Sequence, residues 1–482
     1  MNVIGKQIPK IDGTGLVTGT PAYTSDLNIN NHGLTVKLMR SPHAAARIRS
    51  IDTREAKAIE GVECVLTYKD VPDIAFTLAG QSVPEPAPYD RRLLDKHVRY
   101  IGDEVAIVAA IDEATALKAI QKIDVEYEVM TPVLELDSAV NNKNLVHNTQ
   151  PHTNFDIGCD SSRNIAASHY SEQGDVEYEL KHSDVVVEST YRTQAQAHAM
   201  METYRATTSL DVNGRLQVMT STQIPFHVRR HLSRILGMPL SKIKIIKPRV
   251  GGGFGGKQTV MAEMFPAVVT MLTGKPAAIV YSRRETFSCT TTRHAMRLKV
   301  RIGADRDGCI KAIDIHCVSD TGAYGEHAPT VFWVVGEKTM PLYARATACR
   351  YHGHAVYTNK TPAGALRGYG ATQGTFALES AINELADKLQ MDPTELRLKN
   401  LISEGDVHPE LSGSLPDKPA QLNSSQLHRC IERGKELIGW TTTFPSVKVS
   451  DTKIRGYGMA VTMQGSGISK IDSASVLSLI HI

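Results

Sequence analysis

The stretch that decides the fold is residues 243–258, IKIIKPRVGGGFGGKQ. An apolar, β-branched run ends at Val250, and five glycines around one phenylalanine follow it. Residues 259–264 suit a helix, so the pattern predicts a strand, a glycine loop and a helix. Adjacent glycines permit positive φ and a close approach of the main chain to a ligand. We therefore expect a bulky anionic or oxygen-rich group on this loop, near the positive end of the following helix.

Three interpretations of the glycine stretch stay open on the pattern alone. Gly251, Gly253 and Gly256 satisfy G-x-G-x-x-G, and Arg283 could then meet the phosphate of NADP in a Rossmann dehydrogenase. That interpretation requires the strand ending near residue 281 to lie parallel and adjacent to the strand ending near residue 250. The segment from Gly251 to Lys257 also satisfies G-x-x-x-x-G-K, but a glutamine replaces the hydroxyl that a P-loop uses for magnesium. The third interpretation is a structural turn without a ligand.

Bulk properties are typical of a globular protein with two or three domains. The chain has 482 residues, and its net charge of +3 gives no nucleic-acid footprint. No apolar run approaches membrane-spanning length, and the first residues lack the apolar region of a secretory signal. Seven scattered cysteines show none of the spacings that zinc or iron–sulfur sites use. We expect a cytoplasmic protein without a cluster of its own, and no membrane or nucleic-acid partner.

The first part of the chain alternates between predicted strands and helices, as a compact α/β or α+β domain does. The predicted strands are 34–39, 46–51, 62–66, 105–110 and 125–129, and the predicted helices are 53–60 and 113–123. Residues 141–175 are polar and lack a pattern, which predicts a linker or a long surface connection. Residues 207–220 predict a hairpin whose Asn213-Gly214 pair fits a type I′ turn, and residues 296–318 predict a second hairpin.

Two histidine pairs are candidates for metal ligands. His227 and His231 share one side of a predicted helix over 226–236, but no carboxylate accompanies them in the sequence. We expect them on a helix surface. His352 and His354 share a strand face and are as readily packing residues. No motif nominates a nucleophile.

A second glycine loop, residues 362–370 (PAGALRGYG), follows a predicted strand over 354–358. Behind it, apolar residues trace one face of a predicted helix: Phe376, Ile382, Leu385 and Leu389. The two loops hold Phe254 and the pair Arg367 and Tyr369. This arrangement predicts one site built from two backbone cradles, with a solvated arginine as the plain alternative.

Three motifs in a fixed order carry a resemblance to a known family: Ser221-Thr222-Gln223, the glycines of 251–257, and residues 365–370 with Gln373. Together they resemble the molybdenum-binding subunit of the xanthine dehydrogenase/aldehyde oxidase family. Residues 13–23 are similar to the opening of that family's a/b hammerhead domain. The resemblance implies an α+β fold with three parts: a hammerhead domain over 13–131, a mixed α/β first molybdopterin-binding domain over 141–405, and the beginning of a second one over 406–482.

The resemblance also implies a cofactor, molybdopterin or its cytosine dinucleotide, that carries an oxo/sulfido molybdenum. Gln223 would donate a hydrogen bond to the apical oxo ligand of the metal. The main chain at Phe254, between Gly253 and Gly255, would approach the molybdenum, and Arg367 would touch the cofactor side of the site. Neutral amide donors suit oxo ligands, and the cofactor itself performs the oxidation.

For the substrate, the resemblance implies a flat heteroaromatic ring or an aldehyde. Tyr369 stands where the family has an aromatic that stacks on such rings. Gln258 replaces the substrate-binding glutamate of animal xanthine enzymes, and no arginine occurs near Trp333 where purine enzymes orient their substrate. Gly368 stands where carbon monoxide dehydrogenases carry a copper-binding cysteine. The expected substrate is of purine or nicotinate type, or an aldehyde, with xanthine and carbon monoxide disfavoured.

The resemblance places the catalytic glutamate beyond Ile482, in a second half. Some relatives carry that half as a separate chain, and a truncated reading frame is the alternative. No catalytic residue is therefore assigned here, and Glu202 and Glu263 are the reserve candidates for a base. Electrons would leave through 2Fe-2S and FAD groups on partner subunits. The apolar residues 475–482 are strand-like, so the chain looks cut inside a domain. The alternatives are the Rossmann dehydrogenase and a non-catalytic scaffold subunit.

Overall fold

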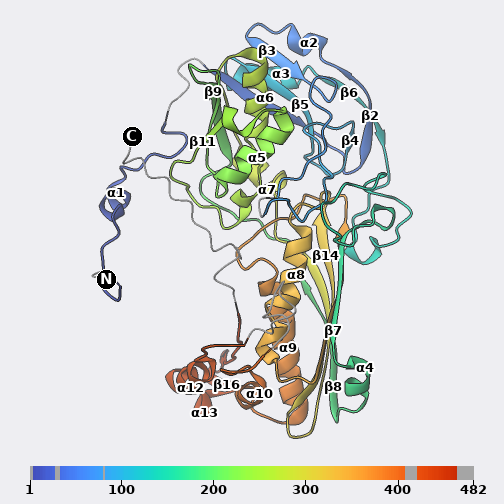
Figure 1. Cartoon of the computed structure of the whole chain (residues 1–482), viewed down its shortest axis with the longest axis vertical. Coiled ribbons are helices and arrows are strands. Elements are labelled where there is room, and N and C mark those ends of the chain that lie inside the picture. The colour runs from blue at the N-terminus through green and yellow to red at the C-terminus, as the bar shows by residue number, and fades with distance from the viewer. Residues whose placement is uncertain (1–3, 28–32, 80–81, 408–420, 464–482) are drawn as a thin grey trace.

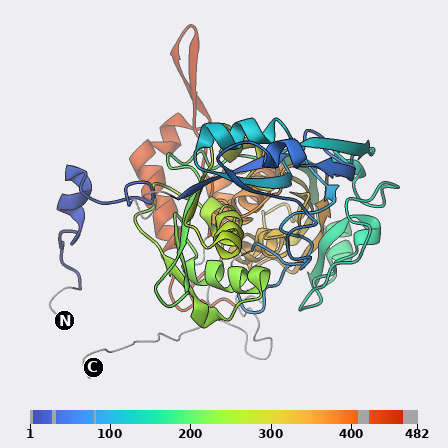
Figure 2. The same cartoon turned by 90° about the horizontal axis from the view of Figure 1, so that it is seen from above.

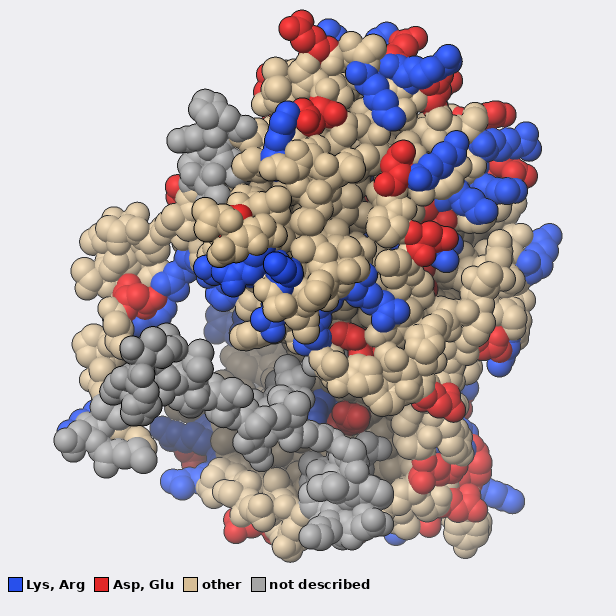
Figure 3. Space-filling view, turned by 45° about the horizontal axis from the view of Figure 1, so that its top comes forward, with Lys and Arg blue, Asp and Glu red and all other residues tan. Residues whose placement is uncertain are grey.

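The structure, a computed structural model, describes residues 4–27, 33–79, 82–407 and 421–463. Two bodies follow one another along the long axis (Figure 1). The upper body holds a seven-stranded sheet, and the lower body holds a five-stranded sheet with two helices, α8 and α9, along it. On the face drawn in Figure 3, basic and acidic side chains are interspersed.

The upper sheet is mixed, with the strand order β11-β10-β9-β12-β1-β5-β3. Its strands are β1 (Leu34–Arg40), β3 (Val62–Leu66), β5 (Glu104–Ala110), β9 (Arg205–Leu210), β10 (Leu216–Thr220), β11 (Ile243–Ile246) and β12 (Ala277–Val280). The apolar strand β5 is buried along its whole length, as a strand covered on both faces must be. The parallel pair of β1 and β12, with Leu34 opposite Ala277, joins early and late parts of the chain in one sheet.

Short helices and a small sheet complete the upper body. The helices are α2 (Arg54–Lys57), α3 (Glu113–Ile120), α5 (Pro225–Leu236), α6 (Met264–Thr273) and α7 (Arg283–Ser288). Helix α5 ends at Gly237, whose φ of 63° is the left-handed conformation that glycine adopts freely. The small sheet has the order β4-β2-β6, with β2 (Ala46–Asp52), β4 (His97–Val98) and β6 (Asp124–Val129). Helix α1 (Gly13–Thr18) lies apart from the body in Figure 1.

The lower sheet has the order β7-β15-β14-β13-β8. Its strands are β7 (Ile165–Gln173), β8 (Val185–Thr193), β13 (Met296–Ala304), β14 (Ile310–Gly322) and β15 (Ala348–Tyr357). Helices α8 (Ala328–Glu337) and α9 (Ala371–Leu389) pack on it and enclose a core in which Val300, Ile315 and Leu385 are fully buried. Helix α4 (Val176–Lys181) packs on the same sheet at β14, and α10 (Pro393–Asn400) packs on α9.

The last described residues lie at the lower end and pack on the lower body through Ile431 and Val461. Helices α12 (Leu427–Ile438) and α13 (Trp440–Thr443) precede the hairpin of β16 (Ser446–Ser450) and β17 (Lys453–Gly456). The hairpin projects from the molecule (red in Figure 2), and all of its residues are exposed. The predicted strand over 475–482 lies outside the described residues.

Several sequence predictions are confirmed, including all five early strands, the helix over 226–236 and the hairpin over 296–318. The linker predicted over 141–175 is wrong, because residues 165–173 form β7, which pairs with β15 along its length. The turn at Asn213-Gly214 is not type I′, since only Gly214 has positive φ. Phe376 is 49% exposed and lies off the buried face of α9 that Ile382 and Leu385 share.

The Rossmann interpretation is also wrong. It requires β12 beside β11, but β9 and β10 lie between them, and β12 runs antiparallel to β9. Arg283 binds main-chain oxygens instead: its guanidinium donates to the carbonyls of Met200 and Met201 at 2.6 Å each.

Candidate functional site

The first glycine loop is packed too tightly for side chains. A Cβ atom on Gly253 would lie 2.4 Å from Gln223 Oε1, and one on Gly255 would lie 2.7 Å from the carbonyl oxygen of Ala365. Phe254 itself has a φ of 52° and is 51% exposed. A positive φ at a bulky residue is uncommon and requires the surroundings to hold it. The main chain of the loop is therefore packed closely against Gln223 and Ala365.

The predicted helix after the loop begins later than expected. Residues Gly256–Gln258 form one 3-10 turn, and α6 starts only at Met264. The glycines consequently do not lie at the N-terminus of α6, and the expected contribution of a helix dipole is wrong. A ligand on this loop would therefore lie away from the N-terminus of that helix.

A buried ion pair stabilises the first loop. Lys257 Nζ lies 2.8 Å from Glu202 Oε2 and 2.7 Å from Ser221 Oγ, and both charged side chains are almost fully buried. The same carboxylate oxygen accepts the N–H of Gly251 at 2.7 Å and a short hydrogen bond from Ser221. Burial alone would raise the pKa of Glu202, but these hydrogen bonds lower it below its ordinary value. The carboxylate is therefore engaged in holding the loop.

Glu263, the other reserve candidate for a base, is also engaged. Its Oε1 accepts from Thr220 Oγ1 at 2.8 Å, and its Oε2 accepts the N–H groups of Met261 and Ala262 at 3.1 and 3.0 Å. Its side chain is buried, and burial raises its pKa. Glu202 and Glu263 both serve the fold through these contacts.

Gln223 lies directly against the first loop. Its N–H donates to the carbonyl oxygen of Lys257 at 2.9 Å, and its Oε1 accepts the N–H of Gly255 at 3.1 Å. These bonds fix both the main chain and the amide orientation of an exposed residue. Because Oε1 is used internally, Nε2 is the group that this side chain offers to a ligand.

The second glycine loop touches the first. The N–H of Arg367 donates to the carbonyl oxygen of Phe254 at 2.9 Å, and His198 Nε2 lies 2.7 Å from the carbonyl oxygen of Ala365. The structure thus brings together Gln223, the glycines around Phe254 and Arg367, as one pair of cradles requires. The Arg367 side chain is exposed.

Arg293 organises the second loop, a role that no sequence signal indicated. Its guanidinium donates to the carbonyl oxygen of Arg367 at 2.8 Å and to that of Tyr369 at 3.3 Å. It also donates to side chains at the start of α9 and before β9: Thr372 (2.8 Å), Gln373 (3.3 Å) and Gln196 (3.1 Å). Burial lowers the pKa of Arg293. One cation therefore holds the turn that carries Arg367 and Tyr369.

Tyr369 and Gln258, the predicted substrate residues, are connected through a histidine that the sequence did not nominate. The Tyr369 hydroxyl lies 2.8 Å from His327 Nδ1 and 3.0 Å from Thr330 Oγ1. Burial lowers the pKa of His327 to about 4, and a hydrogen bond with the main chain of Gln258 acts in the opposite direction. His327 is thus a neutral ring between the two predicted substrate residues.

The histidine pairs do not form metal sites. His231 is buried, contrary to the expected surface position, and its Nε2 lies 2.9 Å from the carbonyl oxygen of Ala79. His227 Nδ1 lies 2.6 Å from the guanidinium of Arg230. Among the residues that the structure describes, no group of three His, Cys, Asp or Glu could hold a metal ion.

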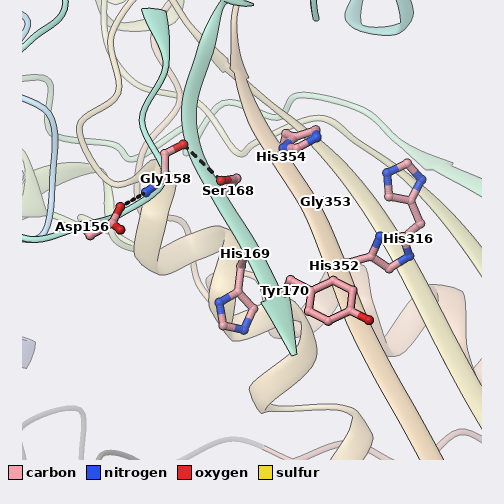
Figure 4. Close-up of a pocket in the computed structure, with 9 residues that line it drawn as sticks. All are labelled: Asp156, Gly158, Ser168, His169, Tyr170, His316, His352, Gly353 and His354. Carbon is pink, nitrogen blue, oxygen red and sulfur yellow. Dashed lines mark hydrogen bonds between the residues drawn. The ribbon is translucent and has the colours of Figure 1, made fainter. Parts of the chain in front are cut away.

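A cavity of about 430 Å³ lies elsewhere, against strands β7, β14 and β15 (Figure 4). It is lined by Asp156, Gly158, Ser168, His169, Tyr170, His316, His352, Gly353 and His354. Burial lowers the pKa of His316 to about 4, and its ring stacks on that of His352 at 4.7 Å. None of the glycine-loop residues lines this cavity. The cavity is therefore distinct from the candidate site at the two loops. Across the described segments, no helix is long and apolar enough to cross a membrane.

Comparisons with known proteins identify the family of the chain. A family model described as "Molybdopterin cofactor-binding domain" matches residues 159–401, and one described as "Aldehyde oxidase and xanthine dehydrogenase, a/b hammerhead domain" matches residues 18–131. The chain is 37% identical to "Probable hypoxanthine oxidase XdhD" of Escherichia coli (strain K12), over 99% of this chain and 52% of that protein. It therefore spans about half the length of that relative.

A shorter relative and a solved structure complete the comparison. The chain is 33% identical to the "Nicotinate dehydrogenase large molybdopterin subunit" of Eubacterium barkeri, over 83% of this chain and 89% of that subunit. The aldehyde oxidoreductase from Desulfovibrio gigas superposes with a TM-score of 0.79 at 27% identity, over 91% of this chain and 47% of that one. The α+β fold of a hammerhead domain followed by a cofactor-binding domain is confirmed. The chain belongs to the aldehyde oxidase and xanthine dehydrogenase family, as part of its molybdenum-binding subunit.

Proposed function

We propose that this chain holds the molybdenum cofactor of a hydroxylase that oxidises an N-heteroaromatic ring of purine or nicotinate type, or an aldehyde, with water as oxygen donor. The observation that carries the proposal is the contact of the two glycine loops, joined by the 2.9 Å hydrogen bond from Arg367 N–H to the Phe254 carbonyl. The contact creates one surface from two stretches that lie more than a hundred residues apart.

The residues at this surface fit molybdopterin. At Gly253 and Gly255 a Cβ atom would collide with Gln223 and Ala365, so only glycine lets these segments pack this closely around the proposed site. Gln223 offers a neutral amide donor, which suits an oxo ligand, and the exposed Arg367 offers a cation beside it. When bound, the molybdenum cofactor supplies the two-electron oxidation. The chain's own residues orient the cofactor, with Gln223 and the main chain at Phe254 on the metal side.

Tyr369 and Gln258 are the proposed substrate residues. Tyr369 presents a partly buried ring whose hydroxyl is already hydrogen-bonded, so its face is what remains for a flat substrate. Gln258 is held at its main chain, where its N–H donates to the carbonyl oxygen of Gly255 at 2.9 Å. Its neutral amide can donate and accept, which suits ring nitrogens and carbonyl groups.

We infer that a catalytic glutamate, further pterin contacts and the nucleotide contacts of a cytosine dinucleotide lie in a second half of the molybdenum subunit. The coverage of half of the E. coli relative but 89% of the nicotinate dehydrogenase subunit supports a separate chain for that half. The 2Fe-2S and FAD groups are assigned to partner subunits, since the sequence has no cluster motif.

The test is to purify the chain alone and with its co-expressed partners, and to measure molybdenum, pterin and turnover. Nicotinate, hypoxanthine and benzaldehyde serve as substrates with an artificial electron acceptor. We expect turnover only in the molybdenum-loaded assembly. Turnover by the chain alone, or a complete assembly without molybdenum and pterin, would contradict the proposal, and the second result would identify a scaffold subunit.

A further inference from the structure

We propose that the hammerhead domain positions the aromatic wall of the substrate site, with His327 as the positioning residue that connects them. This inference rests on the proposed function and goes beyond it. It assigns to the first domain a part in substrate selection, and it adds a residue that contacts the predicted substrate residue Tyr369.

The first step is a set of three consecutive residues that the hammerhead domain holds. The Tyr324 hydroxyl donates to the Asp103 carboxylate at 3.1 Å, and the Gly325 N–H donates to Asp90 Oδ2 at 2.7 Å. Glu326 Oε1 accepts from Arg91 Nη1 at 3.0 Å, with the two side chains 0% and 1% exposed. Three successive positions are thus fixed from outside their own domain by the buried side chains of Asp103, Asp90 and Arg91.

The next residue in the chain is His327, the residue before helix α8. Because residues 324–326 are fixed and α8 follows at Ala328, the main chain at His327 has little freedom. Its ring is buried and neutral at physiological pH. The Nδ1 atom of this ring lies 2.8 Å from the Tyr369 hydroxyl, so the ring contacts the far end of the aromatic side chain.

Tyr369 needs such support because its φ of 58° is unfavourable for a tyrosine. The Thr330 hydroxyl, also on α8, lies 3.0 Å from the same phenol oxygen. Arg293 holds the main chain of the turn, whereas His327 and Thr330 hold the far end of the ring. The ring is therefore fixed at both ends, and one end depends on a segment that the hammerhead domain anchors.

Loss of this support should affect only substrates that stack on the ring of Tyr369. In the assembled enzyme, His327→Leu should raise KM for nicotinate about tenfold and change kcat less than twofold. KM for acetaldehyde, which has no ring to stack, should stay within twofold. His327→Gln keeps an acceptor and a donor, and should recover most of the nicotinate affinity. Tyr369→Phe should raise KM for nicotinate by a similar factor, and adding it to His327→Leu should have no further effect.

The connection to the hammerhead domain is tested with Glu326→Gln, which keeps the shape and one acceptor but replaces the carboxyl group that binds Arg91 by an amide. We expect a two- to fivefold rise in KM for nicotinate with unchanged acetaldehyde kinetics. Anaerobic calorimetry of nicotinate binding gives a readout that is independent of turnover. If the loaded wild-type assembly is active but His327→Leu affects both substrates equally, or neither, the positioning role is refuted. If no substrate is turned over by a loaded wild-type assembly, the proposed function fails instead.

Discussion

The two glycine loops touch each other but are held in different ways. The loop at 251–258 is anchored by Lys257 and Glu202, a buried ion pair that also takes the N–H of Gly251. The loop at 362–370 is anchored by Arg293, whose guanidinium donates hydrogen bonds to neutral oxygens of carbonyl, amide and hydroxyl groups. The first anchor is a buried ion pair. The second is one cation that donates hydrogen bonds to several neutral acceptors.

The difference indicates which loop is the rigid one. A buried ion pair is costly to break, because the remaining charge has no water around it. A cation shared among neutral oxygens loses only part of its bonds when one acceptor moves. We therefore interpret the first loop as the fixed surface for the metal side of the cofactor. The second loop, with Arg367 and Tyr369, can adjust to ligands.

The largest effect is expected at the buried ion pair of Lys257 and Glu202. Lys257→Met leaves the Glu202 carboxylate buried without its cation and should reduce the free energy of unfolding by about 3–5 kcal/mol. Denaturant unfolding measures this change. The double variant Lys257→Met with Glu202→Gln should recover part of the loss. The matched control is Lys448→Met, which breaks the exposed pair with Asp451 and should leave stability unchanged. Equal effects of the two lysine substitutions would contradict the comparison.

The next effect concerns the chemistry of the first loop. Gln223→Glu keeps an oxygen to accept the Gly255 N–H but replaces the Nε2 donor by negative charge. Against an electron-rich oxo ligand, this should lower turnover roughly 100-fold. Stability should be unchanged, because the exposed side chain keeps its bond to the loop. Steady-state kinetics of the assembly, with circular dichroism as the control for folding, decide the outcome. Unchanged turnover refutes the role of Gln223.

A smaller effect is expected at the anchor of the second loop. Arg293→Lys keeps the charge but loses the planar fork that reaches the carbonyls of Arg367 and Tyr369 together. Stability should fall by about 2 kcal/mol. KM for a heteroaromatic substrate should rise, with the cofactor retained. Loss of the cofactor in this variant would show that the second loop, and not the first, fixes the metal side.

The smallest effect is expected outside both loops, at His147. This buried histidine lies where the hammerhead domain contacts the cofactor-binding domain. His147 Nε2 lies 2.7 Å from the carbonyl oxygen of Ala323, and burial together with Arg99 lowers its pKa to about 3. A histidine with a depressed pKa in the folded state contributes stability above pH 6.5, and this stability is lost as pH falls towards 3. Between pH 6.5 and 5.5, His147→Gln should therefore lose about 1 kcal/mol less stability than the wild type. Parallel pH profiles of the two proteins would contradict this prediction.

Local patterns predicted the two loops, whereas their supports depend on distant residues. Glycines next to Phe254 and around Arg367 are visible in the sequence, and their role follows from main-chain freedom. Arg293 lies more than seventy residues from the carbonyls it holds, and nothing in its neighbourhood indicates that role. The sequence pattern around Lys257 indicates only a P-loop, since its partner Glu202 lies in another segment.

The errors in the predicted fold have the same physical origin, which is contact between residues far apart in the chain. Strand β7 was missed because only its first three residues are fully buried, so the sequence lacks an apolar run. The shared upper sheet was not foreseen, because the pairing of β1 with β12 joins residues far apart in the chain. The helix predicted after the first loop begins at Met264, where tertiary contacts override local propensity.

The central claim is that the two loops form the surface that binds molybdopterin, and the cofactor content of a glycine variant tests it most directly. In Gly253→Ala, the new Cβ atom would lie 2.4 Å from Gln223 Oε1, whereas Gly458→Ala meets nothing within 4 Å and serves as the control. Molybdenum is measured by mass spectrometry, and pterin by its fluorescence after release from the purified assembly. We predict close to one molybdenum and one pterin per chain in the wild type and in Gly458→Ala, and less than a tenth of that in Gly253→Ala. Full occupancy in a correctly folded Gly253→Ala assembly would contradict the account.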